Sequence, residues 1–180
     1  MLTLDNTVLL VIDVQGKLAQ LMYQKEALFD NLSRMIKGAQ ILAIPILWTE
    51  QAPDKLGQTT PEIGQLLSET GRPISKTSFS CCGHPPFAAQ LKALERRQIL
   101  LTGIETHICV YQTAIDLLAQ NYEVEVVADA VSARRAENKQ IGLARMQEAG
   151  ARLTSAEMAL FELLQAAEGP KFKEIARLVK

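Results

Sequence analysis

Three reactive side chains each follow a short apolar segment of the chain. Asp13 interrupts the run TVLLVIDV, Lys76 ends PISK, and Cys109 comes shortly after QILLTG. At the start of a helix, exposed backbone amides and a neighbouring ammonium lower the pKa of a thiol from its ordinary value of about 8.5. A carboxylate beside such a thiol can take its proton and return it to a leaving amine. These residue types together predict nucleophilic catalysis by Cys109, with Asp13 and Lys76 as its partners.

The elements that would bring these residues together alternate between β-rich runs and amphipathic segments. Apolar runs without alternation are typical of strands buried on both faces of a parallel sheet. We therefore expect a single α/β domain over residues 1–180, with three α-β-α layers and a mainly parallel six-stranded sheet. The expected strands are Thr7–Val14, Ile44–Thr49, Pro73–Lys76, Gln98–Gly103, Glu123–Ala128 and Ala151–Thr154, and the expected helices are Lys25–Leu42, Pro61–Ser68, Phe87–Arg97, Thr106–Asn121 and Ala136–Ala149, with two more after them and a loop at Glu50–Pro61.

Taken singly, each of the three residues has an ordinary interpretation. An aspartate at a strand end often forms a turn, a lysine is usually a solvated surface charge, and a cysteine among apolar residues is usually a small core residue. The catalytic hypothesis gains weight from their common position, because the carboxyl ends of parallel strands meet at one edge of a sheet, where ligands bind. The turn before the helix at Cys109 would also supply backbone amides for an oxyanion hole.

The composition excludes several other classes of protein. Hydrophobic residues make up 48% of the 180, which is typical of a folded globular chain. The formal net charge of -1, from 19 basic and 20 acidic residues, gives no electrostatic reason to expect nucleic acid or an anionic membrane as a partner. Three cysteines do not make a disulfide framework. With no apolar stretch long enough to span a bilayer and no cleavable leader, we expect a cytoplasmic protein.

Four segments resemble the isochorismatase-like cysteine hydrolase superfamily, in particular the isochorismatase-domain-containing proteins of undefined substrate. In chain order they are VLLVIDVQ, KTSFS, LLTGIETHICVYQTAIDLL and VVADAVS. The resemblance covers nearly the whole chain and implies the Rossmann-like fold of these hydrolases. It places Asp13 at the acid/base position, Lys76 beside the thiolate, and Cys109 at the nucleophile of a G-x-x-T-x-x-C motif.

The same resemblance implies several further features. A cis peptide is expected at Ile104–Glu105, and the backbone amides of Glu105 and Cys109 are expected to form the oxyanion hole. A small-molecule substrate is expected, with no cofactor. Similar proteins are commonly dimers, tetramers or larger assemblies, so a homo-oligomer is expected as well.

Departures from the family narrow the expected chemistry. Metal-dependent relatives such as nicotinamidases carry a D-x-H motif with further histidines, whereas the corresponding segment here, TEQAPDKLGQTTPEI, has none. With only His84 and His107 in the chain, we predict no metal. Isochorismatases proper cleave a vinyl ether without a thiol nucleophile, so Cys109 favours an amide-like or related substrate. An ether hydrolase and a non-catalytic binding protein that keeps the fold remain the alternatives, and the absence of G-x-G-x-x-G or a P-loop sets a nucleotide-binding protein aside.

Several other residues are candidates for the substrate pocket. Trp48 and Phe79 lie at or just beyond strand ends, and Gln15 and Tyr111 could present polar groups. Core packing is the competing interpretation of the aromatic residues. The cluster of Cys81, Cys82 and His84 is predicted to form a loop beside the site rather than a metal centre. His107, two residues from Cys109, is expected to point away from it, and Asp129 is expected to form a turn.

Overall fold

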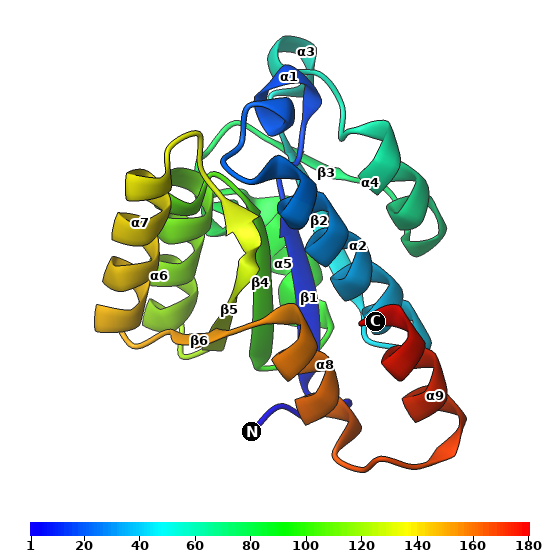
Figure 1. Ribbon diagram of the computed structural model, residues 1–180. Coiled ribbons are helices and arrows are strands. Elements are labelled where there is room, and N and C mark those ends of the chain that lie inside the picture. Colours follow the sequence, from blue (N-terminus) through cyan, green and yellow to red (C-terminus); the bar gives the residue numbers. More distant parts are fainter.

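The computed structural model describes residues 1–180 and has one twisted sheet of six parallel strands (Figure 1). The strand order is β3-β2-β1-β4-β5-β6, so the chain builds outward from β1 in one direction and then returns to the other side of it. This confirms the predicted α/β architecture. The strands are β1 (Thr7–Ile12), β2 (Ile46–Gln51), β3 (Ile74–Lys76), β4 (Gln98–Ile104), β5 (Glu123–Ser132) and β6 (Arg152–Thr154).

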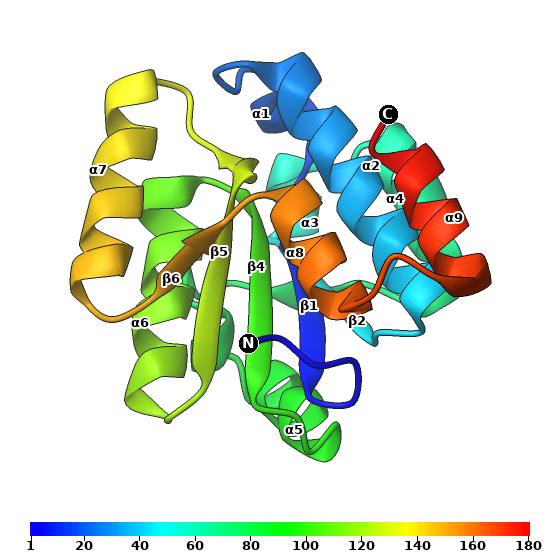
Figure 2. The same cartoon turned by 60° about the horizontal axis from the view of Figure 1, so that its bottom comes forward.

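Helices cover both faces of this sheet, which makes the three layers visible in Figure 2. Five of them, α1, α2, α4, α8 and α9, contribute to one side, and α5, α6 and α7 pack on the other. The helices are α1 (Gly16–Gln20), α2 (Lys25–Leu42), α3 (Pro53–Leu56), α4 (Pro61–Leu67), α5 (Pro85–Ala93), α6 (Tyr111–Ala119), α7 (Ala136–Glu148), α8 (Ala156–Leu164) and α9 (Gly169–Leu178), with short turns η1 (Ser68–Thr70), η2 (Cys81–Gly83) and η3 (Thr106–Val110).

Two hydrophobic clusters hold the layers together, and successive residues of β1 belong to them alternately. Leu9 and Val11 pack toward α2 and α8, whereas Val8 and Leu10 pack toward α5 and α6. All six residues of β1 are buried. The absence of alternation in its sequence therefore has a direct physical cause, because apolar helices cover both of its faces.

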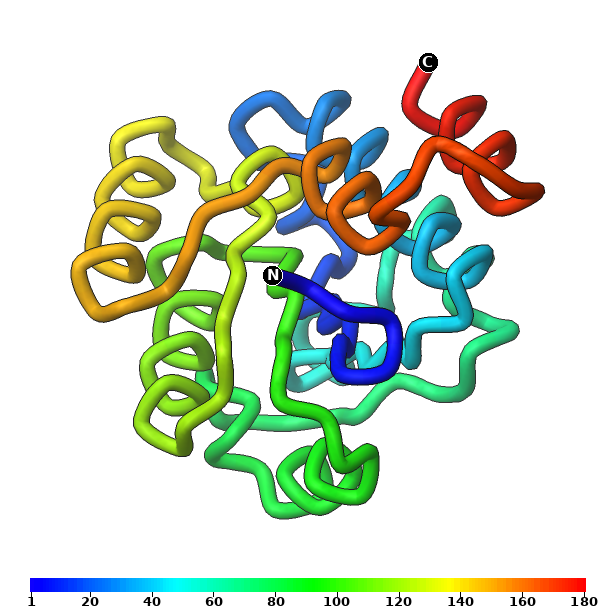
Figure 3. The backbone as a smooth tube through the Cα atoms, turned by 90° about the horizontal axis from the view of Figure 1, so that it is seen from below, coloured from blue at the N-terminus to red at the C-terminus, as the bar shows by residue number.

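The order of the strands reverses between β1 and β4, which makes this the switch point of the sheet. Figure 1 shows α1 and α3 together above the carboxyl ends of these strands. At the opposite edge, Figure 3 shows the N-terminus near the amino ends of β1 and β4, with α9 on the outside beside α2. There the amide of Leu2 donates to Glu162 at 2.7 Å, which ties the N-terminus to α8.

The structure differs from the predicted elements at several boundaries. Strand β1 ends at Ile12 rather than Val14, because Asp13 takes a left-handed backbone conformation with φ 51°. The predicted loop Glu50–Pro61 contains the end of β2 and the one-turn helix α3, and α1 was not predicted. The helix predicted over Thr106–Asn121 begins instead with the π-helical turn η3.

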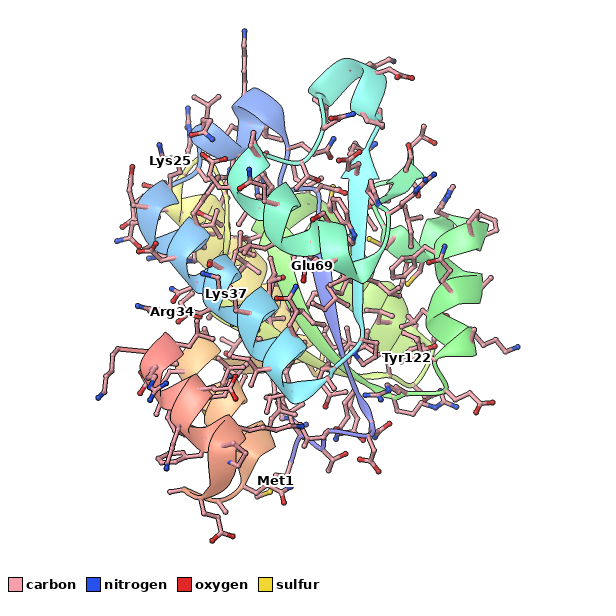
Figure 4. All side chains as sticks on the ribbon, turned by 90° about the vertical axis from the view of Figure 1, so that its right-hand side faces the viewer. Met1, Lys25, Arg34, Lys37, Glu69 and Tyr122 are labelled. Atoms are coloured by element: carbon pink, nitrogen blue, oxygen red, sulfur yellow. The ribbon has the colours of Figure 1, made fainter.

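The outer surface of the α2 layer is polar. In Figure 4, Lys25, Arg34 and Lys37 lie along α2, and Glu69 lies just beyond the end of α4. None of the helices combines the length and apolar character needed to cross a bilayer.

Candidate active site

Asp13 lies at the carboxyl end of β1, at the switch point of the sheet. Its amide donates to the carbonyl of Thr49 at the end of β2, at 3.2 Å. Its side chain is only 4% exposed, and carboxylates are rarely buried to this extent unless they are paired. Both of its carboxylate oxygens are bonded: Oδ2 accepts from Lys76 at 2.6 Å, and Oδ1 accepts from the Thr49 hydroxyl at 2.7 Å.

The Lys76 side chain is fully buried, and its ammonium donates hydrogen bonds to four acceptors. Besides Asp13, it donates to Gln51 Oε1 at 2.9 Å, to the Ser78 carbonyl at 3.1 Å and to the Phe79 carbonyl at 3.2 Å. A buried ammonium requires this degree of compensation, since its desolvation cost is large. The sequence analysis expects Lys76 beside the Cys109 thiolate, and the structure bonds its ammonium to Asp13. Lys76 does not, however, line the cavity beside Cys109.

Thr49 was not predicted as part of the site. Its hydroxyl donates to Asp13 and also lies 3.8 Å from the thiol of Cys81. The backbone amide of Cys81 in turn donates to the Thr113 hydroxyl of α6 at 3.0 Å. Thr49 thus connects the Asp13 carboxylate to the η2 turn. Its position at a strand end was the only sequence signal, and threonine is common in strands for its β-branched shape alone.

Cys109 lies in η3, the π-helical turn that follows β4. Its thiol is buried, and the pKa of this thiol is raised above its ordinary value, first by burial and then by the nearby Asp13 carboxylate; Lys76 acts in the opposite direction but is outweighed. This corrects the expectation that the helix start and Lys76 would lower the thiol pKa. The enclosed carboxylate and the loss of water dominate here.

Two glycines allow the turn of Cys109 to approach the rest of the site. Gly103 has φ 109°, and a Cβ built on it would lie 2.1 Å from the Ile12 carbonyl oxygen. Gly142 of α7 faces η3, where a Cβ would lie 2.9 Å from the Thr106 carbonyl oxygen. A side chain at Gly103 would force β4 away from β1, and one at Gly142 would force α7 away from η3, so both glycines permit close packing around Cys109.

Glu105 joins β4 to η3 and has its own cationic partner. The peptide Ile104–Glu105 is cis, as the resemblance implied. The Glu105 carboxylate accepts from the Arg134 amide at 2.9 Å and from Arg134 Nε at 3.2 Å. The Glu105 side chain is buried, whereas the Arg134 side chain is 55% exposed. This pair anchors the segment before Cys109 to the loop between β5 and α7.

A small cavity of about 90 Å³ opens beside the Cys109 thiol. Most of the side chains around it are apolar, and the acidic ones are Asp13 and Glu105. It is lined by Asp13, Leu18, Gln51, Leu56, Phe79, Ile104, Glu105, Ile108 and Cys109. Larger hollows exist elsewhere on the surface, but none of them includes Asp13, Lys76 or Cys109.

Of the four residues predicted for the substrate pocket, only Phe79 lines this cavity. Trp48 belongs to the core cluster on the α2 face, because its position in β2 directs it into that layer. Tyr111 packs against the opposite cluster, with the Arg145 guanidinium 5.0 Å from its ring centroid. Gln15 is fully buried, and its side chain bonds to the backbone: its amide nitrogen donates to the Gln51 and Gly57 carbonyls, and its oxygen accepts from the Gln51 amide.

The structure places the remaining candidates outside the cavity. Cys81 is buried and Cys82 partly buried, and burial raises the pKa of Cys81 to about 11 and of Cys82 to about 12. No group of three or more histidine, cysteine, aspartate or glutamate side chains is arranged to hold a metal ion. His107 does not line the cavity, and Asp129 accepts from the Ala156 amide at 2.9 Å.

Sequence reasoning missed Leu18, Leu56, Gln51 and Ile108 in the cavity wall. Leu18 and Leu56 come from α1 and α3, two short helices with no strong periodicity. Ile108 stands next to Cys109, but its direction depends on the π-helical geometry of η3. Gln51 ends β2 at the same sheet edge as Asp13, which was the one available signal.

The fold and the site together define an α/β protein with a buried carboxylate, ammonium and thiol at the switch point of a parallel sheet. The isochorismatase domain family model matches residues 7–158. Isochorismatase domain-containing protein 2B of Mus musculus is 39% identical over 98% of this chain and 82% of its own. The chain belongs to the isochorismatase domain family, which confirms the resemblance seen in the sequence.

Solved structures agree with this assignment. The MAR1 ribonuclease from Caenorhabditis elegans superposes with a TM-score of 0.93 and 38% identity, covering 99% of this chain and 91% of its own. The YcaC gene product of Escherichia coli, described as an octameric hydrolase of unknown specificity, gives a TM-score of 0.92 at 22% identity, over 98% and 88% of the two chains. At that identity the YcaC likeness shows the fold alone.

Proposed function

We propose that this protein is a metal-independent cysteine hydrolase that cleaves small amide-like or related acyl substrates through a covalent intermediate on Cys109. One observation carries the proposal: Asp13 is held between Lys76 and Thr49 beside the Cys109 thiol, in a shared cavity. Membership of a family with a hydrolase fold is consistent with it. The absence of a histidine cluster is the reason for assigning no metal.

The raised thiol pKa decides how the first step would proceed. Because burial and the Asp13 carboxylate raise the pKa of the Cys109 thiol, the proposed attack starts from the neutral thiol and needs a base to remove its proton. Asp13 is the carboxylate beside it. As the sulfur bonds to the substrate carbonyl carbon, the thiol proton passes to Asp13 and the carbonyl electron pair moves onto oxygen. The backbone amides of Glu105 and Cys109 are the proposed donors to that oxygen.

The second half of the reaction reverses the proton transfer. Asp13 delivers its proton to the leaving nitrogen as the carbon–nitrogen bond breaks, which leaves an acyl group on Cys109. A water molecule then gives a proton to Asp13 and attacks the acyl carbon, and Asp13 returns that proton to the Cys109 sulfur as the carbon–sulfur bond breaks. Throughout the cycle, Lys76 holds the carboxylate in place and balances its charge.

The test is turnover and acyl-enzyme formation with a panel of small amides and activated esters. Wild-type protein should form an acyl adduct on Cys109, visible as a mass increase on the peptide that contains it. Cys109→Ala should lose turnover by at least about a thousandfold while keeping its circular dichroism spectrum. Cys82→Ala is the matched control and should retain activity. Turnover by Cys109→Ala at the wild-type rate would overturn the proposal.

A second candidate follows from the Caenorhabditis elegans relative, which is described as a ribonuclease and shares 38% identity. The net charge of -1 gives no overall electrostatic attraction to RNA. Cleavage of a labelled RNA by wild-type protein, lost in Cys109→Ala and unaffected by ribonuclease inhibitors, would favour this function. Vinyl-ether hydrolysis and a purely binding role are two further candidates, and persistent failure to form any Cys109 adduct would favour the binding role.

We also propose that the protein works as a homo-oligomer in the cytoplasm. The octameric description of the YcaC protein motivates the first part. Light scattering coupled to size-exclusion chromatography tests it directly, and a monomer at micromolar concentration would overturn it. Location stays a prediction from the sequence, to be tested by fractionation of the source cells.

A further inference from the structure

We propose that the site accepts a small, uncharged acyl group and discriminates against acyl groups that carry a carboxylate. This inference rests on the proposed function, because it concerns the carbonyl compound that Cys109 attacks. It goes further by naming the charge and polarity of the substrate. Three features of the cavity support it: its small size, its apolar wall, and the absence of an uncommitted cation within it.

The size of the cavity limits the group next to the reacting carbonyl. Its volume of about 90 Å³ is far below the roughly 300–1,000 Å³ of pockets that take drug-sized ligands. A cavity of this size favours a small acyl portion, and a larger leaving group would have to extend beyond it.

The wall of the cavity favours apolar groups. Leu18 and Leu56 come from the two short helices above the sheet, while Ile104 and Ile108 come from the segment around Cys109. Phe79 is 54% exposed, so its ring remains partly open to solvent while its residue lines the cavity. Contact between these side chains and an alkyl or vinyl group would remove apolar surface from water on both sides.

No lysine or arginine lines the cavity, and the ammonium that contacts Asp13 is already committed. The Lys76 ammonium donates hydrogen bonds to Asp13, to Gln51 Oε1 and to two backbone carbonyls, and its side chain is fully buried. The Gln51 amide nitrogen is also used, since it donates to the Thr77 carbonyl at 2.7 Å. A substrate carboxylate would find no free ammonium inside the cavity.

The two acidic residues of the cavity also repel a substrate carboxylate. Asp13 and Glu105 both line the cavity, so an added carboxylate would lie near two existing ones. Arg134 pairs with Glu105, but its side chain is 55% exposed and does not line the cavity. Isochorismate, being a dicarboxylate, is a poor fit to this charge arrangement, which separates the inference from vinyl-ether hydrolysis.

Aldehydes of equal size and different charge provide the test. The Cys109 sulfur bonds to the aldehyde carbon, the carbonyl electron pair moves onto oxygen, and that oxygen ends with the thiol proton, so the thiohemiacetal forms reversibly without a leaving group. The matched probes are 4-methylpentanal and succinate semialdehyde, in which an isopropyl group replaces a carboxylate. Protection of Cys109 against iodoacetamide, followed by mass spectrometry, measures the affinity of each.

We expect 4-methylpentanal to protect Cys109 at a concentration at least about tenfold lower than succinate semialdehyde, because like charges placed together in a binding site are strongly unfavourable. Leu56→Lys should narrow or reverse that ratio by placing an ammonium at the cavity. Leu56→Met is its control and should keep the wild-type ratio. Leu56 is 39% exposed, so neither change disturbs the core.

The possible failures can be told apart. Equal or tighter protection by succinate semialdehyde would overturn the inference and leave the proposed function intact. If Arg134→Gln then removed that protection, Arg134 would be the residue that receives the carboxylate. If neither aldehyde protects Cys109 and no acyl adduct forms with any amide or ester, the proposed function falls and the inference falls with it.

Discussion

The ammonium of Lys76 lies 2.6 Å from Oδ2 of Asp13, and neither side chain is exposed by more than 4%. An isolated buried charge would be very costly, so each member of this pair stabilises the other. The pair also fixes the direction of the carboxylate. Asp13 cannot turn away from Cys109 without breaking the bonds to Lys76 and Thr49.

Loss of Lys76 should destabilise the fold as well as the site. Lys76→Met leaves the Asp13 carboxylate buried without its cation, and breaking such a pair typically costs about 3–5 kcal/mol. The free energy of unfolding, measured in urea, should fall by that amount. In the double variant Asp13→Asn/Lys76→Met, the loss should be smaller than the sum of the two single losses. Additive losses would show that the pair is not coupled.

Asp13→Asn should separate thiol ionisation from catalysis. The Asp13 carboxylate raises the pKa of Cys109, so its neutralisation should lower that pKa. The midpoint of Cys109 alkylation by iodoacetamide should therefore move to lower pH. Turnover should nonetheless fall by at least about a hundredfold, because the leaving group loses its proton donor. An alkylation midpoint that moves to higher pH would contradict this arrangement of charges.

Thr49 should act as a positioning residue for Asp13. Thr49→Val keeps the shape but removes the donor to Oδ1, so the carboxylate loses one of the two bonds that fix its direction. We expect kcat to fall by about tenfold with little change in KM, because a misdirected base slows proton transfer and not binding. Thr49→Ser restores the hydroxyl and should restore kcat. A kcat that is the same in Thr49→Val and wild type would rule this role out.

Gly103 should be required for the close contact between β1 and β4. Gly103→Ala places a Cβ about 2 Å from the Ile12 carbonyl oxygen, at φ 109°. Gly150 has nearly the same φ, 107°, but no atom lies within 4 Å of the position a Cβ would take. Gly150→Ala therefore measures the backbone strain without the clash. We expect Gly103→Ala to lower the free energy of unfolding by at least about 2 kcal/mol more than Gly150→Ala, from the added overpacking. Similar losses in the two variants would mean that the clash is relieved by movement.

The chain's local patterns were enough to predict the architecture. The apolar run of β1 does not alternate, because this strand is buried on both faces. The helical spacing of apolar residues in Lys25–Leu42 reflects burial of α2 on one face. For the same reason, Asp13, Lys76 and Cys109 could be selected from the sequence alone. Polar residues at the ends of apolar strands are conspicuous, and the parallel topology brings those ends to one edge.

What surrounds these residues depends on the tertiary structure alone. Thr49 contacts Asp13 because β2 lies beside β1, and Cys81 contacts Thr49 because η2 is held against α6. The directions of Trp48 and Tyr111, away from the cavity, depend on which face of each element packs inward.

The thiol of Cys109 shows the difference most clearly. Its residue type and its place after a strand marked it as a nucleophile in the sequence. Its ionisation, by contrast, depends on how completely neighbouring segments exclude water and where the Asp13 charge lies, and together these raise the thiol pKa instead of lowering it. Burial and charge proximity are properties of the packed chain, so only the tertiary structure could decide them.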